Sequence, residues 1–404
     1  MQKKLNRAFS GSMIFYFAMF SAMFSFISVY LLSKGFENTT IGTVLSITGI
    51  LSIFIQTAVA DFLDKHPSIR LQNTVSIYTI FIIPLSLLLY VAPANFIMLL
   101  LIILIFSLAQ SSETLLNALA FVFERFGIQI NYGIARGLGS LSFAIGTLFI
   151  GFIVEATTPN ILPLFYVLFA IGLLLCIRAY RHPEEEMFQG IIHPDDPKPE
   201  DELEATETTL TGFLKRNKRL VLLMIGLSGF LFTHSVINNF FIQIISPIGG
   251  NNASMGVALF VGAIVELPAM FHYDKIEQKI PVNQLLIISG IFYLIKHVLT
   301  YFAPNMTVIY IAQLFQIGAF ALMYPAAVSY IRSAVARKDL IKGQSLFTTA
   351  MAVGSVAGSF LGGILLDEAG VSFTLFIGIL ATVIGIAIVL ISLEKQPVKQ
   401  SKLN

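Results

Sequence analysis

The sequence predicts an all-α membrane protein with twelve membrane-spanning helices in two bundles of six. The first observation is composition: the 404-residue chain is 56% hydrophobic and only 12% charged, with a mean hydropathy of +0.82. Soluble globular chains are usually a little under half apolar, so this chain belongs in a bilayer. The second observation is that the apolar residues form long continuous runs. The third is that one long polar segment, residues 181–219, divides these runs into two sets.

Each half contains six apolar runs of roughly 20 residues or more, long enough to cross about 30 Å of hydrocarbon as a helix. The runs of the first half are residues 11–33, 40–62, 72–92, 96–123, 132–155 and 161–180. Those of the second half are residues 220–245, 254–271, 282–302, 307–331, 343–366 and 371–393. Because the runs are continuous rather than alternating in polarity, they favour helices over the strands of a membrane barrel.

The polar segment contains too few apolar residues to build a core. We therefore expect a linker on the cytoplasmic side of the membrane. The predicted organisation is a first bundle at residues 1–180, the linker at 181–219, a second bundle at 220–393 and a cytoplasmic tail at 394–404.

The basic residues support this topology. When both termini are cytoplasmic, Lys34 is the only one of the 25 lysine and arginine residues that falls in an outer loop, as the positive-inside rule requires. The net charge of +2 follows the topology rather than forming one patch, so nucleic acid is not an expected partner. Two basic residues, Arg136 and Lys296, fall inside predicted helices.

The two halves repeat each other. Asp64 and Lys65 follow the second predicted helix, and Asp274 and Lys275 follow the eighth. The fifth and eleventh helices are both glycine-rich, which allows close helix contact in lipid. Two parallel six-helix repeats indicate a rocking transporter with its site between the bundles near mid-membrane. We interpret these four charged residues, together with Asp61, as gating residues at the inner side.

The inner loop also carries a family resemblance. Asp64 and Lys65 followed by Arg70 resemble the signature of the major facilitator superfamily, with Ala60 where its glycine is expected. Three longer stretches are similar to the lactose permease and its oligosaccharide/proton symporter relatives: residues 131–140, 265–270 and 289–296. The resemblance implies the major facilitator fold, alternating access, a proton as coupling ion with no other cofactor, and a bacterial plasma membrane.

Glu266 and Lys296 lie at matching depth in the eighth and ninth helices. A charge at mid-bilayer costs about 2.5 kcal/mol or more, so it normally faces a cavity or a partner. The two side chains can therefore pair. In the functional interpretation, Glu266 accepts solute hydroxyls and a proton while Lys296 balances its charge. The alternative is a purely structural ion pair.

Arg136 stands where the resemblance places the symporters' sugar-binding arginine. A guanidinium group donates two parallel hydrogen bonds, which suits adjacent hydroxyls. The alternative is that Arg136 only caps the cytoplasmic end of the fifth helix. The family's partner glutamate would fall near Asn117, which is not ionisable. Glu113, one turn away on the same face, is the substitute we expect.

The seventh helix supplies His234 and Asn238, which are four residues apart and therefore share a face. Imidazole and amide groups suit a neutral polyol, but they also serve helix–helix hydrogen bonding. In the tenth helix, Gln316 and Ala319 replace the family's proton-coupling histidine and glutamate. We include Gln316 among the solute-binding residues. The candidates for proton coupling are then Glu266, Glu113 and His234, and facilitated diffusion is the alternative if none titrates.

These residues predict transport of a small polar solute, most directly an oligosaccharide or glycoside, by proton symport. The alternatives are a nucleoside transporter, an exporter of amphipathic compounds and a solute sensor that does not transport. The sequence has no phosphate-binding loop and no nucleophile elbow, so we expect no enzyme. Its single cysteine, Cys176, and the separated His182 and His193 match no compact metal site. A transporter of this size needs no partner, and we expect a monomer.

Overall fold

The structure, a computed structural model, describes the chain except for residues 67, 124–126, 182–208, 337–338 and 394–404. The described residues form helices and no strand. The first half contains α1 (Gln2–Phe24), α2 (Ile27–Ser33), α3 (Asn38–Lys65), α4 (Leu71–Val91), α5 (Phe96–Leu119), α6 (Tyr132–Ala156), η2 (Pro159–Ile161) and α7 (Leu162–Ala179). The second half contains α8 (Leu210–Arg216), α9 (Lys218–Asn239), α10 (Phe241–Ile245), η4 (Ser246–Ile248), α11 (Asn252–Phe271), α12 (Tyr273–Lys279), α13 (Val282–Tyr301), α14 (Met306–Leu314), η5 (Phe315–Ile317), α15 (Phe320–Ala334) and α16 (Leu340–Ser392).

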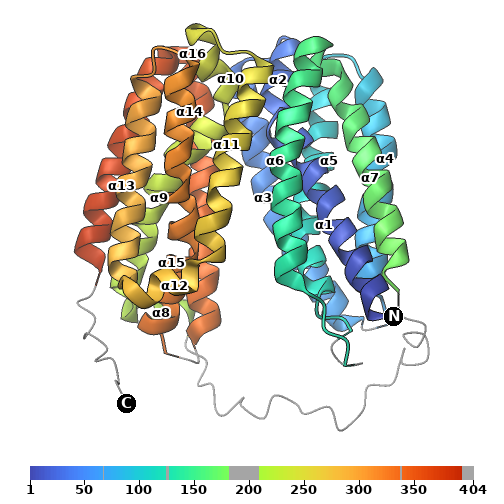
Figure 1. Cartoon of the computed structure of the whole chain (residues 1–404), viewed down its shortest axis with the longest axis horizontal. Helices are drawn as coiled ribbons and strands as arrows, with labels where there is room; N and C mark the ends of the chain where they lie inside the picture. The colour runs from blue at the N-terminus through green and yellow to red at the C-terminus, as the bar shows by residue number, and fades with distance from the viewer. Residues whose placement is uncertain (67, 124–126, 182–208, 337–338, 394–404) are drawn as a thin grey trace.

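The two halves stand side by side (Figure 1). Within the described residues, ten helical segments are long and apolar enough to cross a membrane, and the α1–α2 pair, bent by 40°, raises this number to eleven. The chain is therefore a multi-pass membrane protein. Met1, α8 and α12 mark the end of the molecule that we name the lower end, and α2 and α10 mark the upper end (Figure 1).

Helix α16 is a special case because its 53 residues would span about 80 Å if straight. Its backbone leaves the helical region at Gly370, where φ is 78°. Residues on both sides of this break pack at the same level of α9: a Cβ on Gly354 would meet Ser228, and one on Gly226 would meet Gly385. The two parts of α16 therefore run in opposite directions. The predicted boundary between residues 343–366 and 371–393 falls at this turn.

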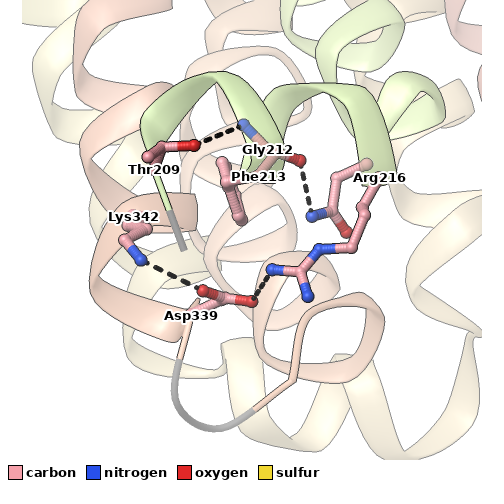
Figure 2. Close-up of polar contacts among 7 residues, drawn as sticks. Thr209, Gly212, Phe213, Arg216, Asp339 and Lys342 are labelled. Atoms are coloured by element: carbon pink, nitrogen blue, oxygen red, sulfur yellow. Dashed lines mark hydrogen bonds and ion pairs between the residues drawn. The ribbon is translucent and has the colours of Figure 1, made fainter. Parts of the chain in front are cut away.

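The end of the predicted linker differs from the expectation. Residues 210–216 form the short helix α8, and α9 begins at Lys218 rather than at residue 220. Phe213 of α8 is completely buried. Arg216 forms an ion pair of 3.0 Å with Asp339, which also lies 3.3 Å from the Lys342 ammonium (Figure 2). Phe213, the partly buried Leu214 and the ion pair therefore anchor α8 on the second half, a contact that composition alone does not predict.

The backbones of the two halves come into close contact where α6 crosses α11. A Cβ on Gly151 would lie 2.6 Å from the carbonyl oxygen of Asn252 and 2.9 Å from the Cα of Gly256. Only glycines permit this backbone approach. Toward the lower end the ribbons of the two halves diverge (Figure 1). The backbone contacts that join the halves are therefore concentrated at the upper end, while toward the lower end the Phe271 side chain of α11 still reaches Gly137 of α6.

Two carboxylates at the upper end cap helices of the opposite half. Asp367 of α16 accepts four hydrogen bonds from the start of α3, two from the backbone amides of Asn38 and Thr39 and two from their side chains, at 2.6–3.2 Å. Glu155 of α6 accepts two hydrogen bonds of 2.9 Å from Asn252 at the start of α11. Carboxylates stabilise helix N-termini because the first amides lack partners and carry partial positive charge. We name this arrangement the reciprocal clamp.

We predict that Asp367→Asn opens the upper end. The variant loses the negative charge and half of its acceptor capacity at the start of α3. We expect the closed upper end to lose about 1.4 kcal/mol of stabilising free energy, a typical value for a charged helix cap. This corresponds to about a tenfold larger open population. The measurement is the distance distribution between spin labels at Ser33→Cys and Ser246→Cys in a Cys176→Ser background.

The matched control for this variant is Glu368→Gln. Glu368 is the next residue and is also exposed, but none of the hydrogen bonds among the described residues joins it to the first half. Its replacement removes the same charge and should leave the distance distribution unchanged. Equal effects of the two variants would show that general charge, rather than the cap, holds the upper end closed.

Candidate functional site

The second half contains a chain of three polar side chains. The ammonium group of Lys296 on α13 donates to Oε1 of Gln316 at 2.6 Å. The amide nitrogen of Gln316 then donates to Oε1 of Glu266 on α11, also at 2.6 Å. We name these residues the Lys–Gln–Glu chain. Lys296 is only 1% exposed, and Glu266 is partly buried.

The chain corrects the expectation that Glu266 and Lys296 pair directly. No ion pair between them occurs among the described residues, and the amide of Gln316 lies between the two charges. An amide suits this place because its oxygen accepts from the ammonium while its nitrogen donates to the carboxylate. Gln316 lies in η5, where the predicted tenth helix is interrupted between α14 and α15. Pro325 lies beyond this interruption, inside α15.

The first half contributes a second polar group around Arg136 of α6. Its guanidinium group donates to Oγ of Ser140 at 2.7 Å and lies 4.3 Å from the centre of the Phe17 ring of α1. This position over an aromatic ring is favourable for a cation. The positive charge of Arg136 also acts electrostatically on Glu113 of α5 and on Glu266 of α11. Arg136 therefore faces α1, α5 and the opposite half rather than only ending a helix.

Asn117 belongs to the same neighbourhood, because its Oδ1 accepts a hydrogen bond of 3.1 Å from the Tyr132 hydroxyl. Glu113 and Asn117 lie one turn apart on α5 and are both partly buried. Asn117 is thus linked to Tyr132 of α6, and Glu113 on the same face of α5 is within the electrostatic influence of Arg136. Tyr132 was not singled out from the sequence.

His234 and Asn238 share a face of α9, as predicted from their spacing. The amide nitrogen of Asn238 lies 2.9 Å from Nε2 of His234. The imidazole ring stacks on Phe320 of α15 with 5.9 Å between centroids. It also meets the Tyr293 ring edge-on at 5.7 Å. His234 therefore joins the second-half site through aromatic contacts, which the sequence pattern did not predict.

The predicted gating residues lie at the lower end and are exposed. Lys65 forms an ion pair of 2.7 Å with Asp61 of the same helix. Asp64, Asp274 and Lys275 are also exposed. In the part of the chain that the structure describes, no ion pair links these residues across the halves. Their gating role stays a prediction about another conformation.

Two buried residues of α13 were missed by the sequence analysis. Tyr293 is fully buried, and His297, next to Lys296 in the chain, is 1% exposed. Nδ1 of His297 lies 2.8 Å from the hydroxyl of Thr382 on α16. The signal that the sequence offers for His297 is its place beside an intramembrane lysine.

Two bundles of membrane-spanning helices that enclose charged and amide side chains of both halves define a membrane transporter. The chain matches the MFS_1 like family over residues 7–377. It belongs to this family and is a transporter of the major facilitator type, not an enzyme.

Individual relatives agree with this class. The chain is 26% identical to the "Uncharacterized transporter YwbF" of Bacillus subtilis (strain 168), an alignment that covers 96% of this chain and 94% of the relative. It is 24% identical to the maltose permease of Geobacillus stearothermophilus, with 95% and 94% covered. The structure is similar to that of the nucleoside transporter NupG, with a TM-score of 0.77, 14% identity and 96% and 98% covered.

We predict that Gln316→Met destabilises the protein. Methionine has a similar volume but cannot form both hydrogen bonds. The buried ammonium of Lys296 and the carboxylate of Glu266 therefore each lose a partner. Hydrogen bonds to charged groups contribute about 1.5–3 kcal/mol each, so a clear fall in thermal stability is expected. The measurement is the melting temperature of the purified protein.

Gln313→Met is the matched control, because Gln313 is also a buried glutamine of the same span and lies outside the chain. It should lower the melting temperature less than Gln316→Met. An equal or smaller effect at Gln316 would contradict the bridging role.

Proposed function

We propose that this protein is a proton-coupled symporter of a small polar solute, most directly an oligosaccharide or glycoside. In this proposal the chain crosses the membrane twelve times, with the two parts of α16 as separate spans. Both termini lie in the cytoplasm of a bacterial cell, so the lower end is the inner end. The protein acts as a monomer. The similarity to a maltose permease supports the sugar assignment.

One observation supports the proposal most directly: buried or partly buried charges of opposite sign lie in the two halves. Arg136 belongs to the first half and Glu266 to the second, and the positive charge of Arg136 acts electrostatically on Glu266. A solute with adjacent hydroxyls can accept hydrogen bonds from the guanidinium and donate to the carboxylate. Such a solute joins the halves, which is what a rocking mechanism requires of its cargo.

The proton is assigned to Glu266. Its carboxylate is partly buried, accepts from Gln316, and connects through this amide to the Lys296 ammonium. A carboxylate at this depth is a functional-site candidate because its two protonation states differ strongly in their interactions. Proton and solute together would stabilise the state in which the halves exchange openings. Glu113 and His234 remain the alternative proton sites.

The concentration of interhalf contacts at the upper end supports assigning the described conformation as open to the cytoplasm. The reciprocal clamp and the Gly151–Gly256 contact close the upper end. The predicted gating residues of the lower end are exposed and make no contact across the halves among the described residues. In the outward-open state these contacts would break, and the lower charges would come together.

A nucleoside is the second candidate solute. His234 and Phe320 stack on each other, and Tyr293 adjoins them. An aromatic surface of this kind stacks on a planar base, and Arg136 suits the diol of a ribose. The likeness to NupG concerns the fold and does not choose between sugar and base.

The first test uses purified protein in weakly buffered proteoliposomes. We expect at least one member of a panel of di- and trisaccharides and nucleosides to drive proton movement. Glu266→Gln should abolish this proton movement while solute counterflow continues, because the variant keeps the hydrogen bonding but not the titration. Proton movement that persists in the variant would assign the proton to another residue, and absence of flux for the whole panel would remove the solute assignment.

The second test concerns Arg136. Arg136→Lys keeps the charge but loses the planar pair of donors, so solute affinity should fall about tenfold or more. Binding to the purified protein measures this change. Arg178→Lys, at the end of α7, is the control and should bind as the wild type does. Unchanged affinity in Arg136→Lys would restrict Arg136 to a structural role.

A further inference from the structure

A cluster of aromatic polar residues lies beside the Lys–Gln–Glu chain. His234 comes from α9, and Tyr293 and His297 lie one turn apart on α13. The centroid of the Tyr293 ring is 5.7 Å from that of His234 and 5.6 Å from that of His297. We name these three residues the His–Tyr–His cluster.

Each residue of the cluster presents one polar atom that has no partner. Among the described residues, none forms a hydrogen bond to Nδ1 of His234, Oη of Tyr293 or Nε2 of His297, although all three atoms are buried. Buried polar atoms in folded proteins are nearly always satisfied, and ordered water satisfies those that protein groups do not reach. The Tyr293 ring adjoins both histidine rings, so one small ligand is the simplest partner for the three atoms.

The remaining ring nitrogens are occupied, which fixes the protonation pattern. The amide nitrogen of Asn238 can only donate, so Nε2 of His234 accepts, and the proton of the neutral ring lies on Nδ1. Nδ1 of His297 lies 2.8 Å from the Thr382 hydroxyl, which itself lies 3.1 Å from that of Thr233. The Thr382 hydroxyl donates to the backbone oxygen of Gly378 at 3.0 Å, so it accepts from Nδ1 of His297 and leaves Nε2 of that ring unprotonated. The unpaired atoms thus include a donor at His234 and an acceptor at His297.

We propose that the His–Tyr–His cluster binds a buried water molecule that relays a proton between His234 and His297. Water fits because it both donates and accepts, and because two to four polar partners are enough to hold it. A metal ion does not fit the donor set, since Nδ1 of His234 carries a proton. The relay extends the proposed proton coupling, and the water site itself does not depend on it.

The proton transfer balances without a co-reactant. A proton that arrives at Nε2 of His234 displaces the hydrogen bond from Asn238, and the ring releases its Nδ1 proton to the water. The water passes one of its own protons to Nε2 of His297, so His234 and the water end neutral and His297 carries the charge.

The surroundings of the cluster determine where the charge can rest. Lys296 of α13 acts electrostatically on both histidines, and Glu266 of α11 acts on Tyr293. The other packed helices contribute Phe320 from α15 and Thr382 from α16. A second positive charge beside Lys296 is unfavourable. The cluster is therefore suited to passing a proton and not to storing one.

The water site is tested by the sign of one stability change. Removing a hydroxyl that has no partner is neutral or stabilising, whereas removing one that binds water costs a hydrogen bond. We expect Tyr293→Phe to lower the melting temperature about as much as Tyr180→Phe, whose hydroxyl donates to the backbone oxygen of Leu119 at 2.7 Å. An unchanged or higher melting temperature for Tyr293→Phe, with a lower one for Tyr180→Phe, would overturn the water site.

The relay is tested in proteoliposomes with a solute that moves protons in the wild type. Tyr293→Phe should slow solute-driven proton uptake several-fold more than it slows solute counterflow, because the hydroxyl holds the water while the aromatic ring is kept. Proton uptake at the wild-type rate would overturn the relay. If no solute moves protons even in the wild type, the proposed symport fails and the relay with it, while the melting comparison still decides whether water is bound.

Discussion

In the interior of a membrane protein, a polar group must find its partners within the protein, because lipid offers none. The ammonium group of Lys296 donates a hydrogen bond to Gln316, and Gln316 donates one to the carboxylate of Glu266. Arg136 meets this requirement through Ser140 and the face of Phe17. The charged groups of both halves are organised by this requirement, because each is held by a neutral or aromatic neighbour.

The same requirement shapes the two ends differently. At the upper end, the first backbone amides of α3 and α11, which have no partner within their own helix, donate hydrogen bonds to carboxylates of the opposite half. The helix ends themselves therefore hold the halves together. At the lower end, Asp61 and Lys65 satisfy each other on one helix and face solvent. A transporter that exchanges its openings must break one set of contacts and form another of similar strength. Caps made of a few hydrogen bonds suit this role better than a large apolar interface does.

Much of the fold could be predicted because the bilayer imposes it: a continuous apolar run of about twenty residues has few alternatives to a spanning helix. The spacing of residues also predicted two further features. These are the close helix contacts of the glycine-rich fifth and eleventh spans and the shared face of His234 and Asn238. The sequence did not reveal that Gln316 separates Glu266 from Lys296, because a bridging amide depends on where three helices meet. Helix α8 was missed because its apolar anchors, Phe213 and Leu214, are buried by residues that are distant in the sequence.

The reciprocal clamp bears on how the chain assembles. Glu155 ends the fifth span and Asp367 lies near the end of α16's first part, which are equivalent positions of the two repeats, and each caps the equivalent helix of the other half. Each half thus supplies one cap and lacks another. A half made alone would have, on the same surface, one carboxylate with no helix to cap and one helix N-terminus with no cap. Two such surfaces are complementary, so the geometry that joins the halves in one chain is also suited to joining two separately synthesised fragments.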